Sequence, residues 1–307
     1  MALTADSPPD AARSPWTITP ITGSFGAELT DGDVRTDLAP GQLLDLLEEH
    51  LVLVIRDQYL SHAQQVDLAR SLGEPTPAHP VVPGHPDHPE ILELDGAKGG
   101  KNARWHTDVT FVAAPPAASV LVADVIPQFG GDTLWANLRD AYATLAPGLR
   151  TLVDDLRAVH RISPLAYWGE PFDSALDRDD AQKLFDDAQR VPPVVHPVVR
   201  LHPSTGRPAL FVNPGFTTHL VGFSRIESEH LLKLLYEHST QPELTLRHRW
   251  RAGDVVIWDN RATMHYATDD YGSTPRRMRR VTIRGGTTRG LDGFESAVVN
   301  DPLLTVR

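Results

Sequence analysis

The sequence predicts a mainly β protein with helices, whose core is a sandwich or a barrel. From residue 79 onward, short runs of β-branched and aromatic residues alternate with Pro and Gly, which is typical of many short strands. The segment before residue 79 has two helical stretches with a strand between them, which gives an α/β start. The chain of 307 residues is 41% hydrophobic, enough for one sizeable core. We therefore expect a disordered tail over residues 1–14 and one domain over 15–307.

The first elements follow from local patterns. We expect a strand over 16–21, a helix over 40–50 with leucines at helical spacing, and a strand over 51–56. A second helix is predicted over 61–72, with Ser61 as its N-cap.

The later elements are mostly strands. We expect helices at 138–144, 147–154 and 227–238, and strands at 91–94, 118–125, 133–136, 194–201, 210–212, 244–250, 255–258 and 281–283. Gly253 and Asp254 predict a hairpin turn between 250 and 255. Residues 163–193 have no clean period, and long irregular segments in compact domains are often functional, so we interpret them as a lid over an active site.

Composition excludes several classes of function. The formal charge of −11 and the pI near 5.6 disfavour a nucleic-acid partner. Cysteine is absent, so any metal must be bound by His, Asp or Glu. The sequence shows no secretory signal at its start and no apolar run that could cross a bilayer, so we expect a cytoplasmic protein with no membrane partner.

One His-x-Asp motif stands out. In an extended segment residues i and i+2 point to the same face, so His106 and Asp108 of WHTDVTF could bind one metal ion together. The pattern alone is weak, because the 14 histidines and 40 acidic residues give about two chance matches. The other matches are His85-Pro86-Asp87 and His88-Pro89-Glu90, which we interpret as a solvated loop.

A non-haem iron oxygenase needs a second histidine beside the His-x-Asp pair. His265 of WDNRATMHYATDDY is the candidate, although alone it would be assigned as a surface or core histidine. Arg276 follows it and could bind a carboxylate through two parallel hydrogen bonds. Strand alternation would place Arg276 and Arg280 on one face, with Arg277 and Arg279 on an opposite, solvated face.

At these residues the sequence closely resembles the taurine dioxygenase family of iron(II)/2-oxoglutarate oxygenases, which also includes alkylsulfatases and herbicide-degrading ether oxygenases. The resemblance runs from about residue 16 to 285 and is strongest in WHTDVTF, GGDTLWAN, ALFVNPGFTTHLV and WDNRATMHYATDDY. It implies a double-stranded β-helix, that is, a jelly-roll, cupin-like core, with Fe(II) and 2-oxoglutarate as cofactor and cosubstrate.

The resemblance also implies roles for single residues. His106, Asp108 and His265 match the iron ligands, and Thr133 and Arg276 match the pair that binds the far carboxylate of 2-oxoglutarate. Residues around the substrate match as well: His79 and Arg280 match the sulfonate-binding pair, Asn102 matches a residue near the amine end, Phe216 matches a pocket aromatic, and the backbone NH of Val109 is a third donor.

The implied reaction is hydroxylation of taurine or a related alkylsulfonate at the carbon bearing sulfur, which releases sulfite and an aldehyde, with succinate and CO2 from 2-oxoglutarate. Val82 stands where the taurine enzymes often have an aromatic residue, which leaves apolar room for a longer sulfonate or a sulfate ester. An alkyl sulfate ester dioxygenase, or a hydroxylase of another small organic acid, is the alternative.

The expected partners are a small anionic substrate, O2 and further copies of the chain in a dimer or tetramer. Two alternatives from other classes stay open on sequence alone. A zinc hydrolase could use the same ligands but would leave Arg276 and Thr133 without a role, and a jelly-roll binding module would have no catalytic activity.

Overall fold

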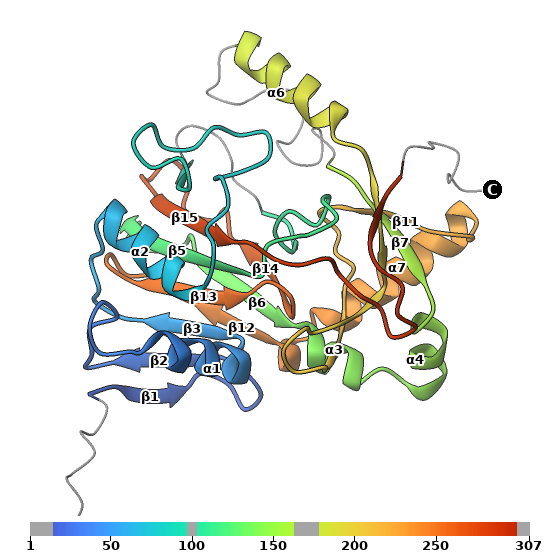
Figure 1. Cartoon of the computed structure of the whole chain (residues 1–307), viewed down its shortest axis with the longest axis horizontal. Helices are drawn as coiled ribbons and strands as arrows, with labels where there is room; N and C mark the ends of the chain where they lie inside the picture. The colour runs from blue at the N-terminus through green and yellow to red at the C-terminus, as the bar shows by residue number, and fades with distance from the viewer. Residues whose placement is uncertain (1–14, 97–102, 163–177, 300–307) are drawn as a thin grey trace, which may run out of the picture.

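The computed structural model describes residues 15–96, 103–162 and 178–299. Its largest layer is a seven-stranded sheet, in which only β2 and β3 run parallel (Figure 1). Its strands, in spatial order, are β1 (Thr17–Pro20), β2 (Ala27–Thr30), β3 (Val52–Ile55), β13 (Val255–Asp259), β5 (Ala118–Val125), β15 (Arg277–Ile283) and β4 (Leu92–Asp95).

Smaller antiparallel sheets form the second layer. One has the order β12 (Thr245–His248), β6 (Thr133–Asn137), β14 (Thr263–Ala267), and another has the order β11 (Thr217–Leu220), β7 (Arg157–His160), β8 (Val194–Pro197), β16 (Ala297–Val298). A ribbon of β9 (Val199–Leu201) and β10 (Pro208–Leu210) continues from β8. The two layers form the jelly-roll core that the resemblance implied.

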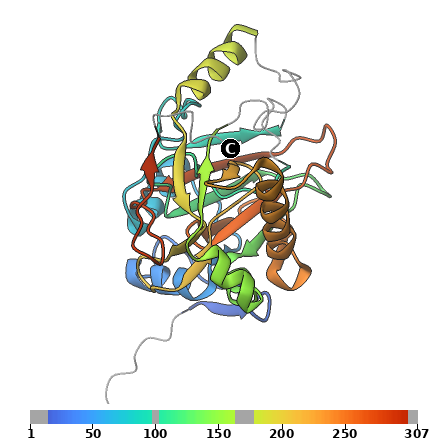
Figure 2. The same ribbon diagram turned by 90° about the vertical axis from the view of Figure 1, so that its right-hand side faces the viewer.

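Helices cover the outside of both layers (Figures 1 and 2). The seven-stranded sheet is covered by α1 (Pro40–His50) and α2 (His62–Leu72). The second layer packs against α3 (Leu138–Ala143), α4 (Pro147–Val153) and α7 (Arg225–Ser239), followed by a 3-10 turn at Pro242–Leu244. None of the described helices has the length and apolarity to cross a membrane.

Alternation along the central strands divides the core in two. In β13, Val255 and Ile257 face α1 and α2, whereas Val256 and Trp258 face the second layer. Trp135 of β6 meets Trp258 across the layers with ring centroids 5.7 Å apart. Each central strand is thus buried on both faces, which explains its continuous apolar sequence. Side chains on the same face as Val256 and Trp258 point between the layers.

Three features differ from the sequence-based predictions. The expected strand over 194–201 is interrupted at Val198 into β8 and β9, which lie in different sheets. Gly253, at φ 86°, does make a turn, but the hairpin prediction is wrong because β12 and β13 belong to different layers. Arg279 does not lie on a solvated face: it is 4% exposed and pairs with Asp124 at 2.7 Å.

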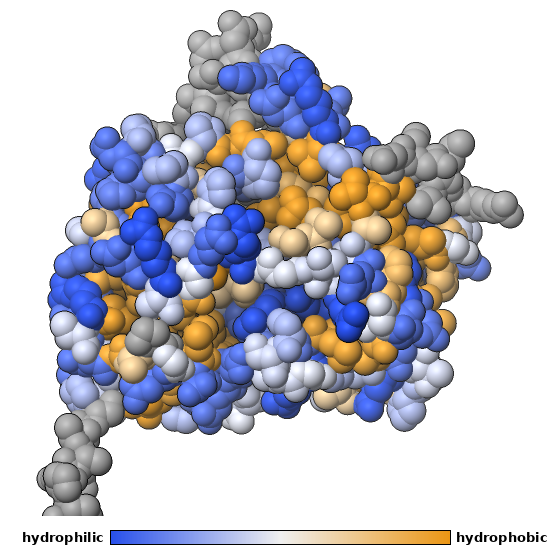
Figure 3. All heavy atoms as spheres, viewed as in Figure 1, coloured by the Kyte–Doolittle hydropathy of each residue, from blue (hydrophilic) through white to orange (hydrophobic). Residues whose placement is uncertain are grey.

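The predicted lid segment, 163–193, is described only from residue 178. There it forms the helix α6 (Arg178–Arg190), which lies at one end of the molecule. Apolar side chains gather below it on the same face of the molecule (Figure 3). Ala188 and Val191 pack on Val109, Phe111 and Phe216.

Candidate active site

His106 and His265 are brought together by the backbone. They form an isolated antiparallel bridge in which the His106 amide donates to the His265 carbonyl at 2.9 Å and the His265 amide donates to the His106 carbonyl at 2.7 Å. Residues paired in this way carry their side chains on the same face of the sheet. Their rings accordingly lie 4.1 Å apart, so the two imidazoles can share one ion.

Asp108 is fixed beside them by hydrogen bonds from distant residues. The amide oxygen of Asn260 accepts from the Asp108 backbone NH at 2.9 Å, and its amide nitrogen donates to the Asp108 carbonyl at 3.0 Å. Ser119 of β5 donates its hydroxyl to Asp108 Oδ2 at 2.8 Å. One carboxylate oxygen is thereby oriented by the protein, while Oδ1 faces the histidines.

The three side chains form a candidate metal centre. All three are buried, and their ligand atoms lie within 4.8 Å of one another. His106 Nδ1 lies 2.9 Å from the Arg104 carbonyl, which can only accept, so Nδ1 carries the proton and the lone pair is on Nε2, 3.8 Å from Asp108 Oδ1. Such outward hydrogen bonds orient metal-binding histidines. Two imidazoles and one carboxylate are the donor set of non-haem Fe(II) oxygenases, so the residues fit this metal.

The charges at the site favour cation binding. Burial lowers the pKa of His106 and His265, so both rings are neutral and can act as ligands. Burial alone would raise the pKa of Asp108, but the guanidinium of Arg280 and the two imidazoles outweigh it and hold the pKa at about 2. The site therefore presents one carboxylate anion and two neutral nitrogen ligands at neutral pH.

Thr133 is the first residue of β6, and Arg276 contacts Gly131, which lies just before that strand. Thr133 shares a face with Trp135, the residue paired with His265, so its side chain points to the same side as that imidazole. Arg276 is 8% exposed, and its Nε donates to the Gly131 carbonyl at 3.1 Å. Arg276 has no ion pair with a carboxylate within the described ranges. A buried guanidinium without a protein counterion can bind an external carboxylate.

Four of the five predicted substrate-binding residues lie around the three candidate metal ligands. Arg280 contacts Asp108 through Nη1. The burial of His79 and, to a smaller extent, the positive charge of Arg280 lower the pKa of His79 to about 3. The rings of His79 and Phe216 each lie within 6 Å of Phe111, at 5.8 and 5.0 Å. Val109 has φ 55°, rare for a β-branched residue and a sign of functional constraint. Asn102 lies outside the described residues.

Sequence analysis missed the residues that hold these side chains in place. Asn260 and Ser119 fix Asp108, and Trp250 donates from Nε1 to the Thr133 hydroxyl at 2.9 Å, which leaves the Thr133 proton for another acceptor. Asn260 lies within WDNRATMHYATDDY, so its position in that motif was the available signal.

Comparison with known proteins gives the class of the chain. Residues 17–282 match the family described as taurine catabolism dioxygenase TauD, TfdA family. The chain belongs to this family, and it is an Fe(II)- and 2-oxoglutarate-dependent dioxygenase. Family membership decides against the zinc hydrolase and the binding module.

The similar proteins have two kinds of named activity, on sulfate esters and on taurine. The chain is 43% identical to an alpha-ketoglutarate-dependent sulfate ester dioxygenase of Pseudomonas putida, over 89% of this chain and 91% of the relative. It is 40% identical to an alkylsulfatase of Acinetobacter baylyi, over 90% and 87% of the two chains. Among solved structures, a taurine dioxygenase from Burkholderia xenovorans matches with a TM-score of 0.79 and 37% identity, over 94% and 96%.

Proposed function

We propose that the chain oxidises a small alkyl sulfate ester at the carbon that bears the sulfate oxygen. The observation that carries this proposal is the position of Arg280, which is 5% exposed and touches Asp108 with Nη1. Its Nε and Nη2 are buried with no hydrogen-bond partner among the residues that the structure describes. A buried cation with two unused donors, beside a metal centre, is suited to an anionic head group.

Each cofactor has its own residues in this proposal. His106, Asp108 and His265 hold Fe(II), and Thr133 and Arg276 bind the far carboxylate of 2-oxoglutarate. The bound iron and 2-oxoglutarate supply the activation of O2 and the oxidising power for C–H hydroxylation. Ser119 and Asn260 keep Asp108 in place, and a buried, preorganised ligand set of this kind lowers the cost of assembling the site.

The substrate head lies between Arg280 and His79. His79 Nδ1 accepts from the backbone amides of Val81 and Val82, both at 3.2 Å, so the neutral ring carries its proton on Nε2 and can donate it to an anionic oxygen. The Val109 amide is the third donor. The chain of the substrate packs on the apolar cluster formed by Val109, Phe111 and Phe216, with Val81 and Val112 at its edge.

A sulfate ester suits this cluster better than taurine does. The ammonium group of taurine would lose its hydration beside apolar side chains, whereas an alkyl chain gains from the same contact. The named activities of the relatives from P. putida and A. baylyi point the same way. Taurine or another alkylsulfonate is the second candidate, because the similar solved structures are named taurine dioxygenases.

The two candidates give different products. Hydroxylation next to a sulfate ester gives a hemiacetal sulfate, which breaks its C–O bond to yield an aldehyde and sulfate. Hydroxylation of a sulfonate breaks the C–S bond and yields an aldehyde and sulfite. In both cases 2-oxoglutarate is oxidised to succinate and CO2.

The test is reconstitution with Fe(II) and 2-oxoglutarate without oxygen, followed by oxygen and one of three substrates: hexyl sulfate, hexanesulfonate or taurine. We expect sulfate from hexyl sulfate in a one-to-one ratio with succinate. Sulfite from taurine or from hexanesulfonate, at a higher kcat/KM than hexyl sulfate gives, would instead establish the second candidate. Succinate formation that none of the three substrates accelerates would reject both.

A further inference from the structure

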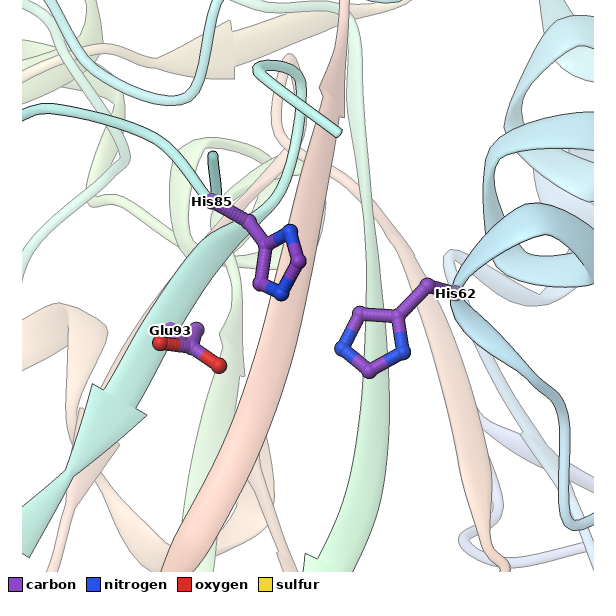
Figure 4. Close-up of side chains that lie close together, drawn as sticks. All are labelled: His62, His85 and Glu93. Carbon is purple, nitrogen blue, oxygen red and sulfur yellow. The ribbon is translucent and has the colours of Figure 1, made fainter. Parts of the chain in front are cut away.

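A second group of metal-ligand side chains lies apart from the active site. His62 is the first residue of α2, His85 lies on the loop between α2 and β4, and Glu93 is in β4. Their ligand atoms lie within 4.8 Å of one another. Figure 4 shows one nitrogen of each imidazole and one carboxylate oxygen facing a common space. This space therefore lies between a helix, a loop and a strand.

A third imidazole completes the cluster. The ring of His88 stacks on that of His62 at 5.7 Å and 15°, and it lies 5.7 Å from the ring of His85. His62 and His85 are 4.8 Å apart. We predicted a solvated loop here: Pro86, Asp87 and Pro89 are exposed as expected, whereas His85 and His88 are half-buried, because the loop folds back through the bridge between them.

The surroundings of His62 disfavour its protonated form. Burial lowers the pKa of His62, and the charges of Arg279 and His85 lower it further. Arg279 itself is bound to both oxygens of Asp124, at 2.7 and 2.8 Å, so its charge is offset. Neutral imidazoles carry a lone pair for a metal, and Glu93 adds a carboxylate.

We propose that His62, His85 and Glu93 form a second metal site, which binds a divalent transition metal ion of the zinc type. Two imidazoles and one carboxylate suit zinc, whereas Mg²⁺ and Ca²⁺ prefer oxygen ligands alone. Water fills the fourth position of the tetrahedron, as in other zinc sites with three protein ligands. The site is independent of the iron centre and of the substrate proposed above.

Metal binding changes the loop in a defined way. His85 Nδ1 accepts a hydrogen bond from the Asp87 amide at 3.1 Å, so its proton is on Nε2. Coordination through Nε2 moves this proton to Nδ1, and the Asp87 amide then turns away. The ion also joins residues 85–88 to α2 and β4. His79 lies earlier on the same connection between α2 and β4.

The test counts zinc in the untagged full-length chain. The protein is stripped with a chelator, equilibrated with zinc chloride and dialysed, and bound zinc is measured by mass spectrometry. Zinc also fits the iron ligands, so we expect about two ions in the wild type. We expect about one ion in His62→Gln/His85→Gln and about one in His106→Gln/His265→Gln. The exposed His230→Gln, which lies on α7, is the matched control and keeps about two.

Amide hydrogen exchange gives a second measurement. In His106→Gln/His265→Gln, zinc should slow exchange over residues 85–93, and the additional change His85→Gln should abolish this effect. Circular dichroism of each stripped variant verifies folding. The proposal is overturned if His62→Gln/His85→Gln binds as much zinc as the wild type, or if His106→Gln/His265→Gln binds none. Loss of iron-dependent activity has no part in this test, so it stands apart from the proposed function.

Discussion

Arg276 offers a sharp test of 2-oxoglutarate binding, because its neighbour Arg277 is exposed. In Arg276→Lys the charge remains but the planar pair of donors is lost. We expect KM for 2-oxoglutarate to rise about 10- to 100-fold, the equivalent of about 1.5–3 kcal/mol for a charged hydrogen bond. The measurement is succinate formation against 2-oxoglutarate concentration. Arg277→Lys should leave KM unchanged, and an equal rise in both variants would contradict the assignment.

Asn260 tests whether an orienting residue controls iron affinity. Asn260→Ala removes both hydrogen bonds to the Asp108 backbone and one to the Pro116 carbonyl at 3.0 Å. We expect Fe(II) affinity to fall about 10- to 100-fold, the usual effect of losing such a partner. Anaerobic titration with Fe(II) measures the dissociation constant. If affinity stays at the wild-type value while only the free energy of unfolding falls, Asn260 has a purely structural role.

Sequence reasoning was strong where chemistry is carried by short motifs. The spacing of His106 and Asp108 follows from a local rule, and the structure places the ligand atoms of His265 within 4.8 Å of theirs. Asn260 could not be identified in this way, because Asn between a strand and a turn is ordinary turn chemistry. Sequence reasoning gave no ground to single out His85, because His62 and Glu93 are brought beside it only by the fold.

At the scale of single elements, the start of α2 is a prediction that the structure confirms. Ser61 accepts from the Gln64 amide at 3.3 Å, and the Gln64 side chain accepts from the Ser61 amide at 2.9 Å. Ser61→Ala should lower the free energy of unfolding by about 1 kcal/mol. Ser61→Asp keeps the acceptor and should retain most of it. Urea denaturation of both variants measures the difference, and equal stabilities would show that the cap contributes nothing.

The elements that sequence analysis missed share a physical cause. β2 has four residues, AELT, and β14 reads TMHYA, so each is too short for a period to emerge. Each forms because it pairs with a longer-range partner, β3 and β6 respectively. In contrast, α1 and α7 have leucines at helical spacing, and their bounds were predicted to within two residues.

At the scale of the whole molecule, the arrangement of layers could not be deduced from local sequence. Gly253 permits a turn, but whether that turn closes a hairpin depends on where β12 and β13 find partners. β12 pairs with β6, and β13 pairs with β3 and β5, so the turn crosses from one layer to the other. This crossing places Trp250 against Thr133 and Asn260 against Asp108, and the active site therefore depends on the topology.

Two buried histidines that contact Thr110, His160 and His196, make the stability of the whole chain depend on pH. His196 is fully buried, its Nε2 lies 2.8 Å from the Thr110 carbonyl, and burial lowers its pKa to about 3. The ring of His160 lies edge-on to that of His196, with the ring centroids 4.8 Å apart. Burial and, to a smaller extent, the charge of His196 lower the pKa of His160 as well. Both rings are neutral in the folded protein, whereas in the unfolded chain they take up protons below their ordinary value of 6.5.

The folded pKa values lie below the unfolded ones, so stability is full above pH 6.5 and is lost as pH falls toward about 3. Each such imidazole contributes a slope of up to about 1.4 kcal/mol per pH unit. Urea denaturation between pH 7.5 and 4.5 measures this slope, and because the carboxylates titrate alike in the wild type and the variants, the difference between the proteins isolates the histidine. His196→Gln should reduce the slope by that amount even if it lowers stability at pH 7.5, and the exposed His230→Gln should leave it unchanged. An identical slope in all three proteins would mean that His196 takes up its proton without unfolding the chain.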